Sequence, residues 1–158
     1  MIQDLHGLDF GPILALNNEH AMETSELDAS RLKALLDMAC YARGVDGGAT
    51  ALLIALDQEA GYENPNFAWF KAAYERFVYI DRVIVADAAR GRGIARALYE
   101  DLFFFAKDSG QERVVCEVNL DPPNAASDAF HAAMGFEAVG QNTIHGGAKT
   151  VRYFAKVL

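Results

Sequence analysis

Arg90-Gly91-Arg92-Gly93-Ile94-Ala95-Arg96 is the stretch that decides the fold of this chain. It lies directly between an apolar, strand-like run, Phe77–Val85, and a helix-like run, Ile94–Asp108. A strand that turns through small residues into a helix leaves backbone N–H groups unpaired at the positive end of the helix dipole. The glycines let an anion approach this backbone, and the arginines supply charge. The sequence therefore predicts a site for a phosphorylated ligand.

The composition indicates a globular protein. The chain has 158 residues, of which 52% are hydrophobic and 23% are charged, and it shows no internal repeat. This size predicts a single domain over residues 1–158. The longest apolar run, Ala49–Leu56, is too short to cross a bilayer, and Met1–His6 lacks the features of a secretory signal. We therefore expect a cytoplasmic protein without a membrane partner.

The charge balance argues against nucleic acid as a partner. The formal net charge is −8, which repels a phosphate backbone. Residues 88–96 nevertheless hold three arginines and no acid. A local cationic patch on an acidic protein is typical of a small-anion site, whereas an arginine-rich solvated turn is the simpler alternative.

The cysteines and histidines do not suggest a metal site or a disulfide framework. Cys40 and Cys116 both lie in apolar contexts, which favours buried thiols. The four histidines show no paired ligand spacing: His6, His20, His131 and His145. We expect no metal cofactor.

The apolar patterns and the turn residues predict a mixed order of helices and strands. The expected elements are a short strand Ile13–Leu16, one or two helices within Glu23–Met38, a hairpin of Cys40–Val45 and Ala49–Leu56, a helix Phe67–Arg76, strands Phe77–Val85 and Arg113–Asn119 on either side of helix Ile94–Asp108, a helix Ala125–Met134, and a hairpin of Phe136–Thr143 and Thr150–Val157. This order predicts an α+β fold in α/β/α layers, with a mixed, mostly antiparallel sheet and helical crossovers in its middle.

Two common phosphate motifs do not fit the glycine-rich turn. A dinucleotide fingerprint needs a third glycine, but Arg96 stands there. It also needs an acidic residue about twenty positions on, where this chain has Arg113. A P-loop needs a Gly-Lys-Ser/Thr run, which is missing.

The turn instead resembles the acyl-CoA pyrophosphate loop of GNAT-type N-acetyltransferases. That family's pattern, Arg/Gln-x-x-Gly-x-Gly/Ala, is met by Arg90–Ala95. A second motif of the family, which begins with asparagine and ends with Gly-Phe, is met by Asn124 through Phe136, except that His131 stands where tyrosine is usual. The resemblance covers the second half of the chain in its motifs, and the first half only in its element order.

The resemblance implies acetyl-CoA as cosubstrate, bound where two central strands of the sheet part. The gap would lie between Phe77–Val85 and Arg113–Asn119. Backbone groups of Val83 and Val85 would bind the pantetheine, and an N–H of Ile84 or Val85 would polarise the thioester carbonyl. The implied pyrophosphate residues are Arg90, Gly91, Arg92, Gly93, Ile94 and Ala95, and Asn124 would flank the pantetheine.

Acetyl transfer to an amine also needs a base and a way to stabilise the leaving thiolate. Glu117 is the first candidate for the base because the Glu117-Val118 pair resembles one found in some family members. Asp81 and Tyr79 are alternatives, since period-two alternation would place them on one strand face with Val83 and Val85, and a base acting through water also fits. His131, as imidazolium or as neutral imidazole, would donate to the sulfur.

The acceptor amine is left open by the sequence. The resemblance places its pocket among Asn17–Leu27, Gly61–Tyr74 and Asn142–Gly147. An aromatic set lies in or near the middle segment: Tyr62, Phe67, Trp69, Phe70 and Tyr74. Acids expected near the entrance would favour a cationic amine: Glu19, Glu23 and Glu26.

Three functions remain open at this stage. The leading one is an N-acetyltransferase acting on a small-molecule or peptide amine. The others are an acyl-CoA-binding or regulatory module with weak catalysis, and a relative of the fold without a CoA site. A homodimer through the hairpin Thr143–Leu158 is a further expectation.

Overall fold

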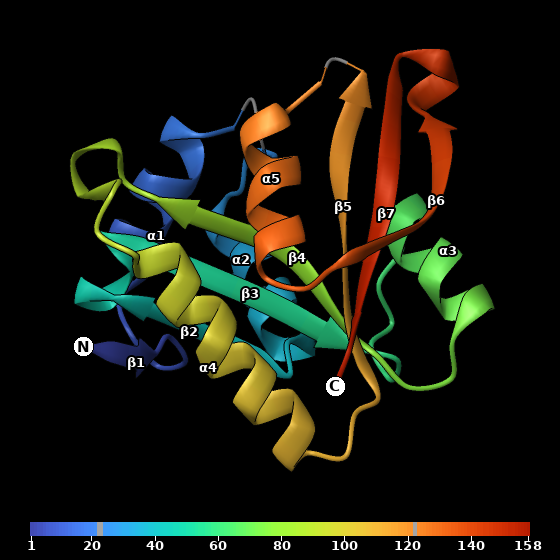
Figure 1. The fold of residues 1–158 in the computed structure, drawn as a ribbon. Coiled ribbons are helices and arrows are strands. Elements are labelled where there is room, and N and C mark those ends of the chain that lie inside the picture. Colours follow the sequence, from blue (N-terminus) through green and yellow to red (C-terminus); the bar gives the residue numbers. More distant parts are fainter. Residues whose placement is uncertain (22–23, 122) are drawn as a thin grey trace.

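A seven-stranded sheet in the order β1-β2-β3-β4-β5-β7-β6 forms the centre of the molecule (Figure 1). The structure is a computed structural model that describes residues 1–21, 24–121 and 123–158. The strands are β1 Ile2–Asp4, β2 Tyr41–Val45, β3 Ala51–Asp57, β4 Val78–Val85, β5 Arg113–Asp121, β6 Glu137–Ile144 and β7 Lys149–Val157. All neighbouring strands are antiparallel except β4 and β5.

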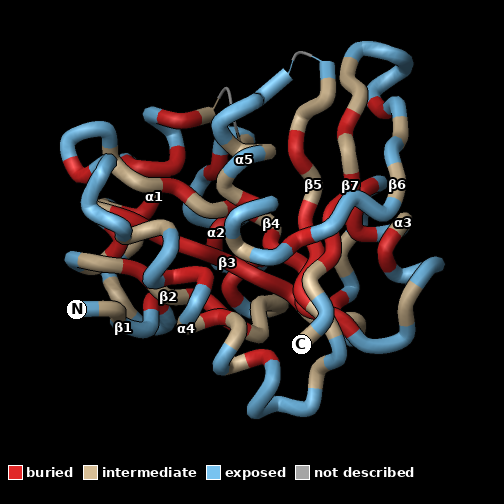
Figure 2. Tube along the Cα trace, viewed as in Figure 1, coloured by how far each residue is buried: buried red, intermediate tan, exposed pale blue. Residues whose placement is uncertain are grey.

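Helices cover both faces of the sheet and enclose two apolar cores. The helices are α1 Phe10–Glu19, α2 Ala29–Met38, α3 Pro65–Ala73, α4 Ile94–Asp108 and α5 Ala125–Ala133. The core on one face includes residues from α1, α2 and α3, and the core on the other face includes residues from α4. Figure 2 shows β3 as an almost continuously buried strand in the middle of this arrangement. The predicted α/β/α layers and the mostly antiparallel sheet are therefore confirmed.

Most predicted elements lie where the sequence pattern placed them. Helix α4 has the predicted bounds, and the predicted hairpins and crossover strands differ from the observed ones only at their ends. Strand β5 extends to Asp121, which pairs with Thr150 after an irregularity in the register.

In the first half of the chain, two predictions were wrong or incomplete and one strand was not predicted. Ile13–Leu16, expected as a strand, lies inside α1, where Ile13 and Leu16 are buried three residues apart, as on one face of a helix. Strand β1 was missed because it is a short edge strand with mostly exposed side chains. Within the expected helical stretch Glu23–Met38, α2 begins only at Ala29 after its cap Asp28, and Glu23 lies outside the described residues.

Strands β4 and β5 separate soon after they begin. They pair only through Val78 with Val114 and Tyr79 with Val115. Beyond these pairs the two strands diverge, with α5 lying over the gap in the view of Figure 1. The expected splay between the central strands is therefore present.

A β-bulge at Asp81 accompanies the splay. On β3, Ile54 pairs with Arg82 and Ala55 pairs with Ile80, so Asp81 has no partner of its own. The extra residue reverses the alternation of side chains along β4. Tyr79 packs in the core under α1–α3, whereas Val83 and Val85 pack against the opposite core. The expectation that Tyr79 shares a face with these valines was wrong for this reason.

The central strand β3 should dominate the stability of the fold. Leu53 is fully buried on β3, so Leu53→Ala should lower the free energy of unfolding by about 2–5 kcal/mol in chemical denaturation. Phe104→Ala is the matched control, since Phe104 is 76% exposed on α4 and its loss should change stability by less than about 0.5 kcal/mol. Equal effects of the two substitutions would contradict this packing.

Candidate active site

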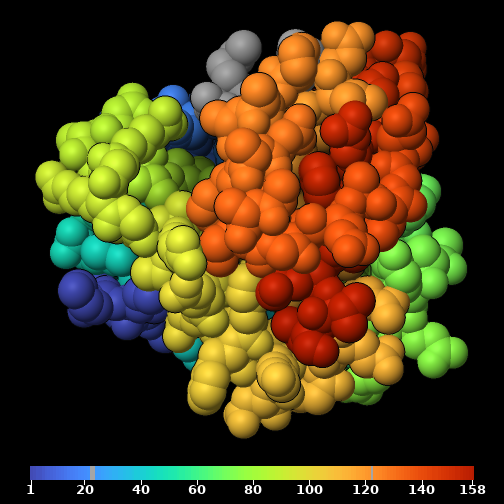
Figure 3. Space-filling model, in the orientation of Figure 1, coloured from blue at the N-terminus to red at the C-terminus, as the bar shows by residue number. Residues whose placement is uncertain are grey.

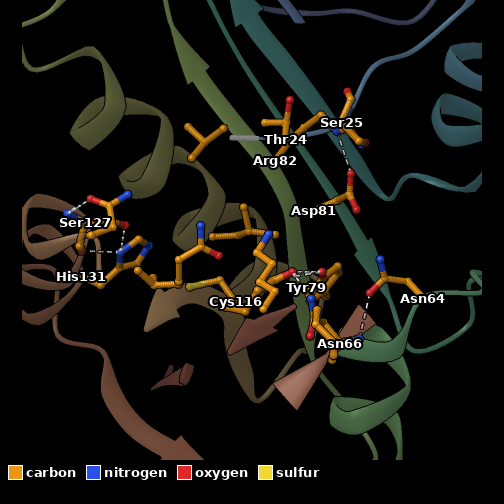
Figure 4. Close-up of a pocket in the computed structure, with 18 of the residues that line it drawn as sticks. Thr24, Ser25, Asn64, Asn66, Tyr79, Asp81, Arg82, Cys116, Ser127 and His131 are labelled. Atoms are coloured by element: carbon orange, nitrogen blue, oxygen red, sulfur yellow. Dashed lines mark hydrogen bonds and ion pairs between the residues drawn. The ribbon is translucent and has the colours of Figure 1, made fainter. Parts of the chain in front are cut away.

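Two adjoining cavities lie at the splay. We call the first the polar cavity; it measures about 360 Å³ and is lined mainly by polar side chains from β4, β5, α5 and three loops (Figure 4). The second, the loop cavity, measures about 570 Å³ and lies between the glycine-rich turn, α4 and α5. Figure 3 shows a hollow between the turn and α5. Four residues line both cavities and mark their junction: Val83, Tyr99, Ser127 and His131.

The loop cavity is built around the uncapped start of α4. Gly93 occupies the cap position in the left-handed conformation (φ 73°), and no side chain there accepts a hydrogen bond from the first turn. Each of the other four α-helices has a side-chain cap: Asp9, Asp28, Asn64 and Asn124. The first N–H groups of α4 therefore remain available to an anion, as the sequence predicted.

Most of the residues predicted to bind CoA gather at the loop cavity. Its lining includes Val83, Val85, Arg90, Gly91, Gly93, Ile94 and Ala95. Arg92 is exposed and is not part of this lining. Ile84 lines a small third cavity beside the loop cavity. Asn124 lines the polar cavity, and its side chain caps α5 by accepting from the N–H of Ser127.

The backbone groups of Val83 and Val85, the two valines predicted to bind pantetheine, point into the gap between β4 and β5. The N–H of Ala86 donates to Thr50 on the β3 side. Because backbone groups alternate along an antiparallel pair, Ile84 also turns toward β3, whereas Val83 and Val85 turn toward the gap. Of the two N–H groups considered for the thioester carbonyl, that of Val85 therefore faces the gap and that of Ile84 does not.

Glu117 lies on β5 at the wall of the polar cavity, held by two donors. The Tyr79 hydroxyl donates to its carboxylate at 2.6 Å, and the Asn66 amide nitrogen donates at 2.8 Å. Burial raises the pKa of Glu117 to about 7, the nearby Asp81 carboxylate adds to the rise, and both hydrogen bonds oppose it. A carboxylate with this pKa can accept a proton near neutral pH.

Asp81, one of the alternative bases, is already engaged. One carboxylate oxygen accepts from the Tyr62 hydroxyl at 2.6 Å, and the other accepts from Nε of Arg82 at 2.8 Å. Tyr79, the other alternative, is buried, and its pKa is raised well above its usual value by burial and by the carboxylates of Glu117 and Asp81. Both close donors of Glu117 bind one oxygen, Oε1, and Oε2 has only a contact of 3.1 Å with the Tyr79 hydroxyl, so the geometry favours Glu117 among the three.

His131 lies at the junction of the cavities with both ring nitrogens occupied. Nδ1 lies 2.8 Å from the carbonyl oxygen of Ser127, which can only accept, so Nδ1 carries the proton. Nε2 therefore accepts from the Tyr99 hydroxyl at 2.8 Å. Burial lowers the pKa of His131, which favours the neutral ring. This arrangement disagrees with an imidazolium that donates directly to sulfur.

Cys116 also lines the polar cavity, but its environment disfavours the thiolate that a cysteine nucleophile needs. It is buried, and burial raises the pKa of its thiol well above the usual value. The neutral thiol agrees with the expectation of a packed cysteine.

The polar cavity receives residues from each segment that was expected to form an acceptor pocket. These are Thr24 and Ser25, then Tyr62, Asn64 and Asn66, and then Ile144 and His145. Of the aromatic set, only Tyr62 lines the cavity. Phe67 and Phe70 lie in the core, and Trp69 stacks on Tyr153 at 4.3 Å between ring centroids. Neither Glu19 nor Glu26 lines this cavity, and Glu23 lies outside the described residues.

Sequence reasoning missed the residues that support Glu117. Tyr153 donates to Asn66 at 2.8 Å, and Asn66 in turn donates to Glu117. These residues come from β7 and from the start of α3, so no local motif connects them. The only available signal was Asn64-Pro65-Asn66, which marks a helix start and places Asn66 in its first turn.

Comparison with known families agrees with this geometry. A sequence model of the Acetyltransferase (GNAT) family matches residues 47–136, more than half of the chain. The chain belongs to the GNAT acetyltransferase family. It is therefore an acyltransferase, and the cosubstrate of its family is acetyl-CoA. No curated protein sequence matches the chain.

Solved structures share the GNAT fold with this chain over nearly its whole length. A ribosomal-protein-alanine N-acetyltransferase from Brucella melitensis superposes with a TM-score of 0.74 at 21% identity, covering 100% of this chain and 99% of that one. NAA60 from Arabidopsis thaliana, solved with a bisubstrate analogue, also gives 0.74, at 14% identity and 99% and 97% coverage. The NatC complex bound to Gag peptide and CoA gives 0.70, at 16% identity and 100% and 98% coverage. At these identities, the likeness concerns the fold.

The described part of this GNAT protein contains neither a membrane-spanning helix nor a metal-binding cluster. In residues 1–21, 24–121 and 123–158, no helix is both long and apolar enough to span a bilayer. The same part of the chain contains no cluster of three or more histidine, cysteine or acidic side chains suited to a metal ion.

The raised pKa of Glu117 predicts a pH-dependent stability. Its usual value is 4.5, so between about pH 4.5 and 7 the folded protein holds a proton that the unfolded chain releases. The free energy of unfolding should fall as the pH rises through this window. Above about pH 7, Glu117 should cause no further fall. Chemical denaturation from pH 5 to 8 should show Glu117→Gln gaining stability relative to the wild type across the window. Parallel curves would contradict the raised pKa, and Glu137→Gln, on the exposed start of β6, is the control.

Proposed function

We propose that this GNAT protein is an N-acetyltransferase that moves the acetyl group of acetyl-CoA to a primary amine of a small molecule or peptide. The amine attacks directly while both substrates are bound. The observation that supports this best is the meeting of the two cavities at Val83, Tyr99, Ser127 and His131. One cavity fits the donor, the other fits the acceptor, and Glu117 stands in the wall of the second.

The loop cavity would hold the donor. The pyrophosphate would sit on the uncapped N-terminus of α4, with Arg90 beside it. The pantetheine would run along β4 and pair with the backbone of Val83 and Val85. Its thioester would then reach the junction, with its carbonyl oxygen toward the N–H of Val85.

In the polar cavity, Glu117 would act as general base. The acceptor enters as an ammonium, loses one proton to the Glu117 carboxylate and attacks the thioester carbon. The tetrahedral intermediate then collapses: the C–S bond breaks, its electron pair leaves on sulfur, and the second amine proton passes to that thiolate, directly or through water, which gives the amide and the CoA thiol. His131 would hold the Tyr99 hydroxyl beside the sulfur. His131 would not protonate the sulfur itself, because both of the imidazole nitrogens are engaged.

A specific observation favours the alternative of a weakly catalytic acyl-CoA-binding module. The family's usual tyrosine is His131 here, and neither of its nitrogens is free to donate to the leaving sulfur. Acetyl-CoA binding without turnover on a broad amine panel would select this alternative. A homodimer and a cytoplasmic location stay predictions.

Loss of the base should abolish most of the activity. We expect Glu117→Gln to lower kcat/KM by about 10²- to 10⁴-fold in a thiol-release assay. The wild-type kcat/KM should rise with pH through about 7, because only the ionised carboxylate accepts a proton, and the variant should lose this limb. Glu137→Gln should keep both rate and profile. A variant with undiminished rate would exclude Glu117 as the base.

The arginine at the turn should contribute to donor affinity. Arg90→Gln should weaken acetyl-CoA binding by about tenfold in calorimetry at low salt, because a charge-assisted contact to phosphate is lost. Arg31→Gln on the exposed side of α2 is the matched control for the change in net charge. Equal dissociation constants for the two variants would place the pyrophosphate elsewhere.

A further inference from the structure

The bulge on β4 places two opposite charges side by side in the polar cavity. In a regular strand, successive side chains point to opposite faces. Asp81 is the extra residue of the bulge, so its carboxylate can lie beside the guanidinium of the next residue, Arg82, and both residues line the polar cavity. Their side chains are only 4% and 5% exposed, and Nε of Arg82 lies 2.8 Å from the Asp81 carboxylate. The cavity wall therefore carries a fixed pair of charges in a set order.

The Arg82 guanidinium is anchored through Nε and Nη1 and has donor capacity at Nη2. Nη1 donates to the side chain of Asn17 at 2.7 Å and to the carbonyl oxygen of Ser25 at 3.3 Å, and Nε donates to Asp81. Nη2, by contrast, makes only a long contact of 3.4 Å with the Ser25 hydroxyl among the described residues. Buried guanidinium groups normally satisfy their donors more fully. An edge of this kind, on a cavity wall beside a hydroxyl, is suited to a carboxylate.

A second carboxylate completes the pattern. Glu117 faces the cavity from β5, and its donors Tyr79 and Asn66 lie below Asp81 in the view of Figure 4, whereas Arg82 and Ser25 lie above it. The wall thus presents, in order, the Glu117 carboxylate, the Asp81 carboxylate and a guanidinium edge. An acceptor that matches this order has an ammonium next to a carboxylate.

We propose that the acceptor of this enzyme is a free α-amino acid. Its ammonium would lie between Asp81 and Glu117, and Glu117 would remove the proton. Its carboxylate would bind Nη2 of Arg82 and the Ser25 hydroxyl. This inference rests on the proposed acetyl transfer and specifies its substrate class. A peptide N-terminus offers only a neutral carbonyl at this position, and a diamine would place a second cation against Arg82, so both fit the charge order less well.

The first experiment changes the substrate and leaves the enzyme intact. Thiol release from acetyl-CoA is measured with the twenty amino acids. For each that reacts, it is measured with its amide, its decarboxylated amine and a hexapeptide that begins with the same residue. We expect kcat/KM for the amino acid to exceed that for each analogue by about tenfold or more, which is the worth of one charge-assisted hydrogen bond. Equal or better turnover of the analogues overturns the amino-acid assignment and leaves the acetyltransferase proposal standing.

The second experiment removes the guanidinium. Arg82→Gln should raise KM for the amino acid about tenfold or more and should raise KM for its amide by a smaller factor, so that the ratio of the two kcat/KM values falls. Ser25→Ala, a milder change, should reduce the same preference severalfold. Arg43→Gln is the control, since Arg43 also pairs with a carboxylate, Asp101, but on β2 away from the cavity. Melting temperatures measured alongside separate unfolding from loss of recognition.

The outcomes separate the two proposals. A preference for free amino acids that survives Arg82→Gln undiminished in a folded variant overturns the role of Arg82. Absence of turnover with every amine, despite stabilisation of the protein by acetyl-CoA, overturns the acetyltransferase proposal and the substrate class with it.

Discussion

The hydrogen bonding between β4 and β5 stops after two residue pairs, and the site of this protein depends on that interruption. A strand inside a sheet normally has partners on both sides, because unpaired backbone groups inside a protein cost free energy. Here one side of β4, at Val83 and Val85, faces a gap. A ligand with its own amide groups can replace the missing strand there, which is the physical basis for the proposed binding of pantetheine between the two strands.

The bulge at Asp81 is the second constraint, and it acts together with the first. One additional residue on β4 reverses the alternation, so that Tyr79 and the valines face opposite cores. It also brings Asp81 and Arg82 into one cavity. The residues on the two sides of the splay thus differ in chemistry: backbone amides and an uncapped helix lie on the proposed donor side, and carboxylates with an arginine lie on the proposed acceptor side.

Glu117 illustrates the cost of such a site. Its carboxylate is enclosed next to Asp81, which raises its pKa toward neutrality. Tyr79 and Asn66 compensate in part through hydrogen bonds, and Tyr153 holds Asn66 in place. The site therefore combines a destabilised charge, useful for proton transfer, with a polar network that fixes its position.

The sequence by itself determined the elements that form the proposed donor side of the protein. The turn at Arg90–Ala95, the exact span of α4 and the α/β/α layers all follow from local patterns: glycine conformation, helical periodicity and strand composition. Tertiary structure alone decided how the residues of the proposed acceptor side are arranged. The hydrogen-bond donors to Glu117 come from α3 and β4, and Tyr153 of β7 holds one of them. The bulge depends on the register between β3 and β4, and the contact of His131 Nε2 with Tyr99 depends on how α4 and α5 pack. Such contacts join residues far apart in the chain, and local spacing cannot specify them.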